Sequence, residues 1–138
     1  MQRREAREFL LTALYQREFT GMDLADFISE TETDPGDQLG YIQSSFQHIL
    51  ERQPELDQML GERTVGWRFE RLALIDRNIL RIGLYELLHN EDVPPEVAMD
   101  EAVELAKRFG TDRAREFVNG ILDRIWKDVR EGAQAAAD

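Results

Sequence analysis

The segment LALIDRNILRIGLYELL, residues 72–88, is the most apolar stretch of the chain. On an α-helix, Ile75, Ile79 and Ile82 form one apolar stripe, and leucines form a second stripe beside it. The leucines of the second stripe are Leu80, Leu84, Leu87 and Leu88. Because the two stripes nearly encircle the axis, we expect this helix to be buried on most sides. Gly83 in its middle is about 1 kcal/mol less favourable than alanine, which indicates close helix packing there.

The composition is typical of a soluble globular protein. The 138 residues predict one domain that buries roughly 70% of its unfolded surface, and 42% of them are hydrophobic. No apolar run approaches the ~20 residues that span a membrane, no signal-peptide pattern opens the chain, and there is no cysteine. A cytoplasmic location without membrane attachment is therefore expected. The net charge of −11 repels nucleic acid at long range, so nucleic-acid binding requires a local basic patch.

Proline and glycine fall mostly between segments of helical periodicity, which predicts an all-α fold. Pro54 is expected to begin a new short helix, because proline is favoured at the first helical position. About seven helices are expected, over residues 4–19, 22–30, 37–53, 55–60, 72–89, 96–109 and 113–129. Residues 1–130 are expected to form a single domain. Residues 131–138, rich in glycine and alanine, are expected to form a frayed tail.

The first helix has two distinct faces. Ala6, Leu10 and Leu14 recur at helical spacing on the face that is expected to be buried. The opposite ridge carries Arg4, Arg7, Leu11 and Tyr15, and Arg3 lies at the helix entrance. Charge runs are most often solvated, and that interpretation fits the arginines alone. An exposed leucine and tyrosine beside arginines favour a contact surface instead.

The last helix carries Arg113, Phe117, Gly120 and Arg124 along one edge. By spacing alone, Phe117 is more readily a core residue. The alternative places its ring at the rim of the core beside arginines, where an unpaired base can stack on it. Residues 18–51 hold eight acidic residues and no lysine or arginine, and we interpret them as a solvated side that repels RNA.

The sequence offers no pattern for catalysis or metal binding. It contains no glycine-rich phosphate loop, no Gly-x-Ser-x-Gly and no His-Glu-x-x-His, and its carboxylates are scattered over polar faces. His48 has no cysteine or histidine nearby, whereas zinc sites need several clustered ligands. We therefore expect neither an enzyme nor a metal or cofactor.

Four blocks of sequence occur in one order along nearly the whole chain. They are RREARE (3–8) with ALY (13–15), ILRIGLYEL (79–87) with VP (93–94), DEAVELAK (100–107), and FG (109–110) with FVNGILD (117–123). In this order they resemble the bacterial transcription antitermination factor family NusB. Asp100 departs from the family pattern, in which asparagine stands at that position.

The resemblance implies an all-α fold of about seven helices in two small bundles that share the central buried helix. It implies an RNA-binding factor for transcription antitermination and termination. Such a factor binds the boxA element of ribosomal RNA leader transcripts together with the ribosomal protein NusE. The pair acts in an antitermination complex with RNA polymerase. Some family members self-associate, so a homodimer is compatible with the resemblance.

The resemblance also assigns residues to these two partners. The RNA-binding residues that it implies, together with the neighbouring arginine of the last helix, are Arg3, Arg4, Arg7, Arg113, Phe117, Asn119 and Gly120. The residues expected to face NusE are Leu11, Tyr15 and Asp76. Glu5 stands where relatives often carry a basic residue, which weakens phosphate attraction, and Arg113 stands where an acidic residue is common, which strengthens it.

Two other functions remain open from the sequence. A domain of this fold is fused to some ribosomal RNA cytosine methyltransferases, which requires a downstream catalytic domain. A helical adaptor that uses the ridge of Leu11 and Tyr15 for protein contacts alone is the third interpretation. A preference for boxA RNA distinguishes the adaptor from the RNA-binding factor.

Overall fold

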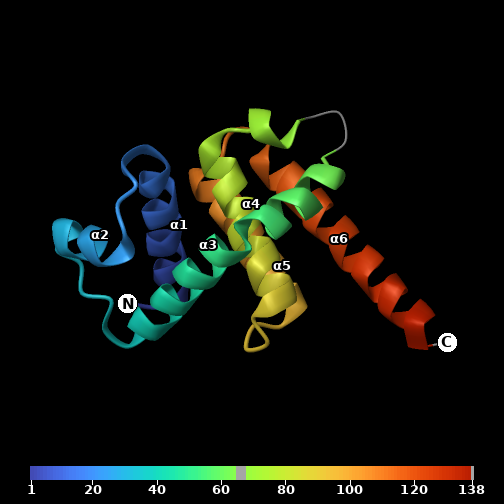
Figure 1. The fold of residues 1–138 in the computed structure, drawn as a ribbon, viewed down its shortest axis with the longest axis horizontal. Coiled ribbons are helices and arrows are strands. Elements are labelled where there is room, and N and C mark those ends of the chain that lie inside the picture. The colour runs from blue at the N-terminus through green and yellow to red at the C-terminus, as the bar shows by residue number, and fades with distance from the viewer. Residues whose placement is uncertain (65–67, 138) are drawn as a thin grey trace. The chain divides into compact units, whose positions relative to one another are not determined.

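The computed structural model describes residues 1–64 and 68–137, and within them the chain forms six α-helices and no strand (Figure 1). The helices are α1 (Arg3–Thr20), α2 (Leu24–Thr31), α3 (Leu39–Glu62), α4 (Leu74–His89), α5 (Pro95–Phe109) and α6 (Ala114–Ala137). Short 3-10 turns precede α3 and α4 at η1 (Gly36–Gln38) and η2 (Phe69–Arg71). The predicted all-α fold is confirmed. None of the helices in the described ranges combines the length and apolar character needed to cross a membrane.

The chain divides into two compact units, residues 1–53 and residues 54–138. The single domain expected over residues 1–130 stays a prediction. The boundary falls inside α3, at Pro54. The expected break at Pro54 is wrong, because α3 is one continuous helix of 24 residues, and this is why there are six helices and not seven. Ile49 before the proline and Leu56 after it are both fully buried. Their burial stabilises the helix against the loss of one backbone hydrogen bond.

In the first unit, α1 and α2 are joined by a tight, capped turn. Gly21 ends α1 with φ +70°, a left-handed conformation that favours glycine, and its N–H donates to the carbonyl of Arg17 at 2.9 Å. The carboxylate of Asp23 then caps α2 by accepting from the N–H of Asp26 at 2.9 Å. The rings of Phe9 and Phe27, 5.1 Å apart, pack the two helices together.

In the second unit, α4 packs with α5 and α6. Every residue from 78 to 87 is buried, so the expectation that this helix is enclosed on most sides is confirmed. Close approach at Gly83 is confirmed as well. A Cβ atom at this position would lie 2.7 Å from Cδ1 of Leu122 on α6 and 2.9 Å from Cβ of Ala102 on α5. Only glycine leaves room for both neighbours.

The polar residues of α4 are satisfied inside the fold. Arg81, almost fully buried, donates from Nε to Oδ1 of Asp57 at 2.7 Å and from Nη2 to Oδ2 at 2.9 Å. Its Nη1 donates to Oδ1 of Asn78 at 3.1 Å. The two hydrogen bonds between Arg81 and Asp57 attach the last turns of α3 to α4. They also compensate the charge of Arg81, which would be costly to bury without a partner.

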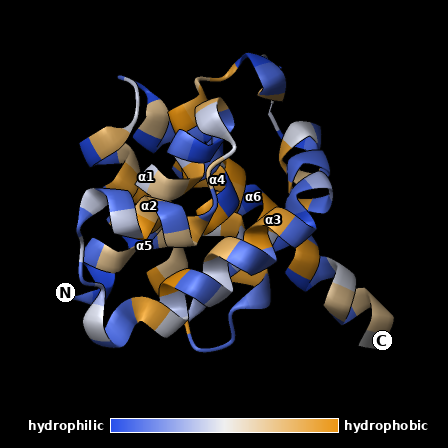
Figure 2. Cartoon of the chain, turned by 60° about the vertical axis from the view of Figure 1, so that its left-hand side comes forward, coloured by the Kyte–Doolittle hydropathy of each residue, from blue (hydrophilic) through white to orange (hydrophobic). Residues whose placement is uncertain are grey.

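Beyond residue 130, α6 continues as a helix through Ala137. The expected fraying of residues 131–138 stays a prediction. Residues 131–136 are exposed, so burial does not explain the helix. The alanines of this segment have the highest intrinsic helix propensity, and they extend a helix that is already nucleated. Figure 2 shows the mixed character of the longer helices, with hydrophobic and hydrophilic residues both present along α3.

The close approach at Gly83 makes a stability prediction. Gly83→Ala should lower the free energy of unfolding by about 1–2 kcal/mol, because overpacking outweighs the ~1 kcal/mol gain in helix propensity. Urea unfolding followed by circular dichroism measures the change. Gly120→Ala on α6 is the matched control. No heavy atom lies within 4 Å of the added Cβ, so this variant should be as stable as the parent protein or more stable. Equal stability of both variants would refute the packing role of Gly83.

Candidate nucleic-acid interface

At the start of α1, two arginines gather on one aromatic ring. The Arg3 guanidinium lies over the Tyr41 ring, with Cζ 4.1 Å from the ring centroid, and its Nε donates to Oε1 of Gln38 at 2.6 Å. The Arg7 guanidinium lies 5.9 Å from the same centroid. Cation–π attraction and a hydrogen bond therefore hold Arg3 against the beginning of α3. Neither Gln38 nor Tyr41 was predicted as part of this site.

The predicted ridge of α1 is only partly exposed. Arg3 and Arg4 are exposed and Tyr15 is half-buried, but Arg7 is only 5% exposed and Leu11 only 1%. The expectation that Leu11 forms an exposed contact surface is wrong, and Arg7 does not lie on an open solvated face. The helix is covered on more than one side, which a two-faced helical pattern does not reveal. Arg4 and Arg7 each make an interaction within the protein, so neither guanidinium is isolated.

Glu5 has a local structural role beside these arginines. Its Oε1 accepts a hydrogen bond from the N–H of Gln2, 3.0 Å away, at the first turn of α1. The carboxylate also lies at the positive end of the helix dipole. The acidic residue at this position thus stabilises the helix start that carries Arg3 and Arg4.

An aromatic pair is exposed at the other end of α1. Phe19 is 62% exposed, the highest value among the large hydrophobic residues that the structure describes as exposed. The Tyr15 ring meets it edge-on, with centroids 5.0 Å apart. A phenylalanine held in solvent by an aromatic neighbour is typical of a protein contact surface.

On α6, the predicted edge lines a small pocket. Phe117 is partly exposed rather than fully buried, which favours the rim position over the core position. With Gly120, Ile121 and Arg124 it forms one wall of a pocket of about 180 Å³. The pocket is also lined by Arg63 and Thr64 after α3 and by Leu72 before α4. Arg113, in the turn before α6, and Asn119 on α6 are exposed but do not line this pocket.

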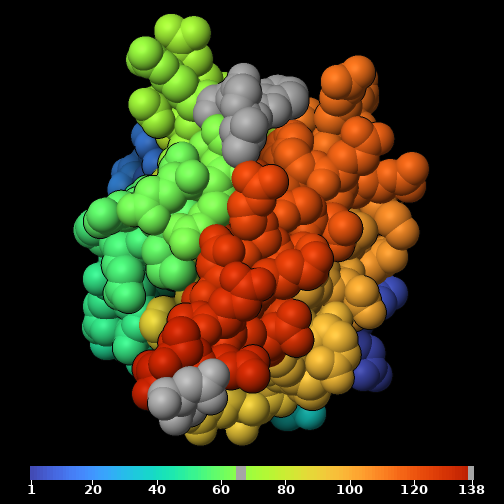
Figure 3. All heavy atoms as spheres, turned by 90° about the vertical axis from the view of Figure 1, so that its right-hand side faces the viewer, coloured from blue at the N-terminus to red at the C-terminus, as the bar shows by residue number. Residues whose placement is uncertain are grey.

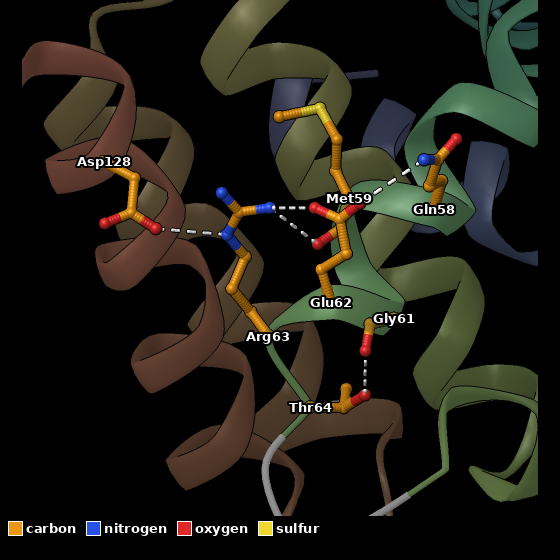
Figure 4. A network of polar contacts seen from close by, with 7 residues as sticks. All are labelled: Gln58, Met59, Gly61, Glu62, Arg63, Thr64 and Asp128. Carbon is orange, nitrogen blue, oxygen red and sulfur yellow. Dashed lines mark hydrogen bonds and ion pairs between the residues drawn. The ribbon is translucent and has the colours of Figure 1, made fainter. Parts of the chain in front are cut away.

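The polar network beside this pocket fixes Arg63 (Figure 4). Its Nη1 lies 2.9 Å from Oε2 of Glu62, and its Nε lies 3.2 Å from Oδ2 of Asp128 on α6. The Thr64 hydroxyl donates to the carbonyl of Gly61 at 3.0 Å. These contacts attach the end of α3 to α6 and neutralise Arg63. The face in Figure 3 presents α6 along its length.

Asp76, which we expected to face NusE, is buried. Its carboxylate is 1% exposed and lies inside the second unit. Oδ2 accepts from the hydroxyl of Thr111 at 2.6 Å, and Oδ1 accepts from the Thr111 N–H at 3.1 Å. The residue therefore fastens the turn between α5 and α6 to the first turn of α4. The spacing of α4 placed Asp76 at a polar interruption, but local spacing does not reveal a partner 35 residues away.

The structure thus groups the predicted residues within each unit. Arg3, Arg4 and Arg7 share the first turns of α1, and Phe117 and Gly120 share the pocket of α6. Among the described residues, no three carboxylate, imidazole or thiol groups are placed to share a metal ion. Each unit thus carries a group of arginines with an aromatic ring, a combination that fits binding of single-stranded nucleic acid.

Comparison with known proteins decides the family. A model described as the NusB family matches residues 4–127. The chain belongs to the NusB family. The transcription antitermination protein NusB of Bacillus subtilis (strain 168) is 41% identical over 135 residues, which cover 95% of this chain and 99% of the relative. The NusB protein of Symbiobacterium thermophilum is 40% identical over 146 residues, which cover 98% of this chain and 95% of the relative.

Solved structures agree with this membership of the NusB family. A T. maritima NusB structure superposes with a TM-score of 0.82 at 38% identity and covers 92% of both chains. A structure of the antitermination factors NusB and NusE in complex with double-stranded RNA superposes with a TM-score of 0.79 at 25% identity. That match covers 91% of this chain and 96% of the other.

The buried position of Asp76 predicts a structural effect rather than a binding effect. Asp76→Ala should lower the free energy of unfolding by about 1–3 kcal/mol, because it leaves the Thr111 N–H and hydroxyl without their acceptor. Asp112→Ala, an exposed carboxylate in the same turn, should change stability by less than about 0.5 kcal/mol. Thermal and urea unfolding measure both variants. Unchanged stability of Asp76→Ala, combined with weaker binding of NusE, would restore Asp76 as a partner residue.

Proposed function

We propose that this chain is a transcription antitermination factor that binds the boxA element of ribosomal RNA leader transcripts. It does so jointly with the ribosomal protein NusE, within an antitermination complex on RNA polymerase. The chain matches relatives over nearly their full length, and these relatives are named as transcription antitermination proteins. This match supports the proposal. A solved neighbour that contains NusB, NusE and RNA supports both partners.

The observation that carries the RNA-binding proposal is the state of Arg3. Within residues 1–64 and 68–137, Arg3 contacts Gln38 and Tyr41 and has no carboxylate partner. In a chain with a net charge of −11, an arginine without a counter-charge is a specific feature. Arg3 and exposed Arg4 offer guanidinium groups to phosphate oxygens, which neutralise part of the RNA charge.

In the second unit, the beginning of α6 supplies a separate set of proposed RNA contacts. Arg113 just before the helix and Asn119 and Gly120 on it are exposed, and Phe117 is partly exposed. An aromatic ring flanked by arginines suits an unpaired base, because every base has a face that can stack. The acidic remainder of the chain disfavours non-specific binding and leaves these basic positions as the preferred contacts.

Tyr15 and Phe19 form the surface that we propose for NusE. The two rings support each other at a 5.0 Å centroid distance, and Phe19 is largely exposed. Tyrosine and phenylalanine are enriched where protein surfaces meet, and exposed apolar rings gain most from being covered. This surface replaces the buried residues Leu11 and Asp76 in the proposed contact.

Arginine substitutions at the start of α1 test the phosphate contacts. Arg3→Ala and Arg4→Ala should each weaken boxA RNA binding and reduce the slope of log affinity against log salt by about one unit. Fluorescence anisotropy across a salt series measures both quantities. The control is Arg17→Ala at the far end of α1, where the guanidinium donates to the Gly21 carbonyl. Unchanged salt slopes for Arg3 and Arg4 variants would exclude them as phosphate contacts.

Aromatic substitutions test the surface for NusE. Phe19→Ser or Tyr15→Ala should weaken NusE binding by about 2 kcal/mol, the loss typical of an interface hot spot. Titration calorimetry with purified NusE gives the affinity. Phe109→Ser is the control, because Phe109 is 41% exposed on α5 and lies outside the proposed surface. Equal losses for the control and the Phe19 variant would argue against a specific surface.

One experiment separates the proposed function from a protein-only adaptor. The affinity for boxA RNA and for a scrambled RNA of equal length is measured with and without NusE. A boxA preference that NusE strengthens supports the proposal, and no preference in either state identifies an adaptor. Light scattering on the same samples reports whether a homodimer forms.

A further inference from the structure

Two side chains at the beginning of α3 hold the Arg3 guanidinium in one orientation. Arg3 Cζ lies 4.1 Å from the centroid of the Tyr41 ring, and its Nε donates to Oε1 of Gln38 at 2.6 Å. All three residues belong to the first unit. Gln38 ends η1 and Tyr41 lies in the first turn of α3, so both contacts come from one short stretch of backbone. The planar guanidinium cannot turn without losing one of the two contacts.

These contacts leave a defined set of donors on Arg3. A guanidinium carries five N–H donors, one on Nε and four on the two terminal nitrogens. Gln38 accepts from the Nε donor, and the Tyr41 ring contacts the group without accepting an N–H hydrogen bond. The donors of Nη1 and Nη2 therefore remain available on an exposed residue. Two parallel N–H groups of this kind match two oxygens of one phosphate.

The hydrogen-bond acceptor of Arg3 is uncharged, which preserves the positive charge of the guanidinium. A carboxylate at position 38 would accept the same hydrogen bond, but it would neutralise Arg3. Asp37 is the neighbouring residue and is exposed, yet the hydrogen bond to Arg3 comes from the amide of Gln38. In a chain with a net charge of −11, a neutral acceptor at this position keeps a site for an anion. A contact that only stabilised the fold would not require a neutral acceptor.

Arg7 brings a second guanidinium to the same ring. Its Cζ lies 5.9 Å from the Tyr41 centroid, and the residue is only 5% exposed. Two positive charges near one ring repel each other, and a bound anion reduces this repulsion. Because Arg7 is buried and interacts within the protein, it contributes positive potential near the ring, whereas Arg3 contributes the accessible donors.

We propose that Tyr41 and Gln38 are positioning residues for RNA binding. They orient Arg3 so that Nη1 and Nη2 bind two oxygens of one backbone phosphate. The ring sets the plane of the guanidinium, and the amide sets its rotation within that plane while leaving its charge intact. This inference rests on the proposed RNA-binding function, and it adds two residues that act through Arg3.

Substitution of the Tyr41 ring tests its role. Tyr41→Leu keeps apolar bulk and should weaken boxA RNA binding about two- to fivefold, the range of an exposed cation–π contact. The slope of log affinity against log salt should not change, because Arg3 keeps its charge. Tyr41→Phe keeps the ring and should restore the affinity of the parent protein. Phe27→Leu is the matched control. Its ring packs on Phe9 in the same unit, so this variant should lower the melting temperature and leave RNA affinity unchanged.

One negative charge placed at two positions tests the amide of Gln38. Gln38→Glu should pair with Arg3, weaken RNA binding and reduce the salt slope by about one unit, as expected for Arg3→Ala. Gln43→Glu adds the same charge at an exposed position of α3 and should have a smaller effect on both quantities. Gln38→Leu removes the acceptor without adding charge, and it should lower affinity at an unchanged salt slope. Equal losses for Gln38→Glu and Gln43→Glu would reject a specific role of the amide.

A double-mutant cycle shows whether both residues act through Arg3. In the Arg3→Ala background, Tyr41→Leu and Gln38→Leu should cause no further loss of RNA affinity. Arg3→Lys keeps the charge but lacks the planar fork, so it should retain the salt slope and lose affinity. RNA that carries one uncharged methylphosphonate linkage at a time locates the contact. One such linkage should weaken binding to the parent protein but not to Arg3→Ala.

Failure of this inference is distinguishable from failure of the proposed function. If Tyr41→Leu weakens binding equally with and without Arg3, its effect is generally structural and the positioning role is overturned. If folded Tyr41→Leu and Gln38→Glu proteins bind boxA RNA as the parent does, this inference is rejected and the proposed function stands. A parent protein without any preference for boxA rejects both.

Discussion

The absence of a side chain at Gly83 is the constraint on which the second unit depends. Ala102 of α5 and Leu122 of α6 both occupy space that a Cβ at Gly83 of α4 would need. The three helices therefore pack closely at this one position. Close packing of this kind gives α4 its continuous burial from residue 78 to residue 87. It also determines where α6 runs, and α6 carries Phe117, Gly120 and Arg124. The position of the candidate RNA-binding residues of α6 thus depends on packing in the core.

The distribution of carboxylates determines which arginines remain available at the surface. Asp57 binds Arg81 inside the second unit, and Asp128 binds Arg63 at the end of α3. Thr111 and Asp76 complete a further buried contact between α4 and the turn before α6. Acidic residues are abundant in this chain, yet several are committed to internal partners. Arg3 in the first unit and Arg124 in the second have no carboxylate partner among the described residues.

Sequence periodicity predicted most of the helices and the burial of α4, because apolar spacing reports directly which face of a helix is covered. Predictions from periodicity were wrong where burial in the tertiary structure overrides the local preference of a residue. Pro54 lies inside α3 although proline is a helix breaker, since Ile49, Leu56 and Leu60 around it are fully buried. Leu11 and Asp76 were assigned to the surface because the apolar pattern of one helix identifies its main buried face. The pattern does not reveal a second side of the helix that other residues also bury. The family resemblance identified Phe117 and the arginines of α1. Tyr41 and Gln38 were missed, because their contact with Arg3 joins residues 35–38 positions apart that no local spacing relates.

The contacts of Arg3 also influence how RNA binding is divided between enthalpy and entropy. An arginine on an open helix samples many side-chain rotamers, and fixing them on binding opposes association. Tyr41 and Gln38 have already restricted the Arg3 side chain during folding. Its guanidinium therefore meets the RNA backbone in a preorganised state, with less freedom left to lose. Removing the Tyr41 ring would leave the charge of the surface unchanged and still raise the entropic cost of binding a phosphate.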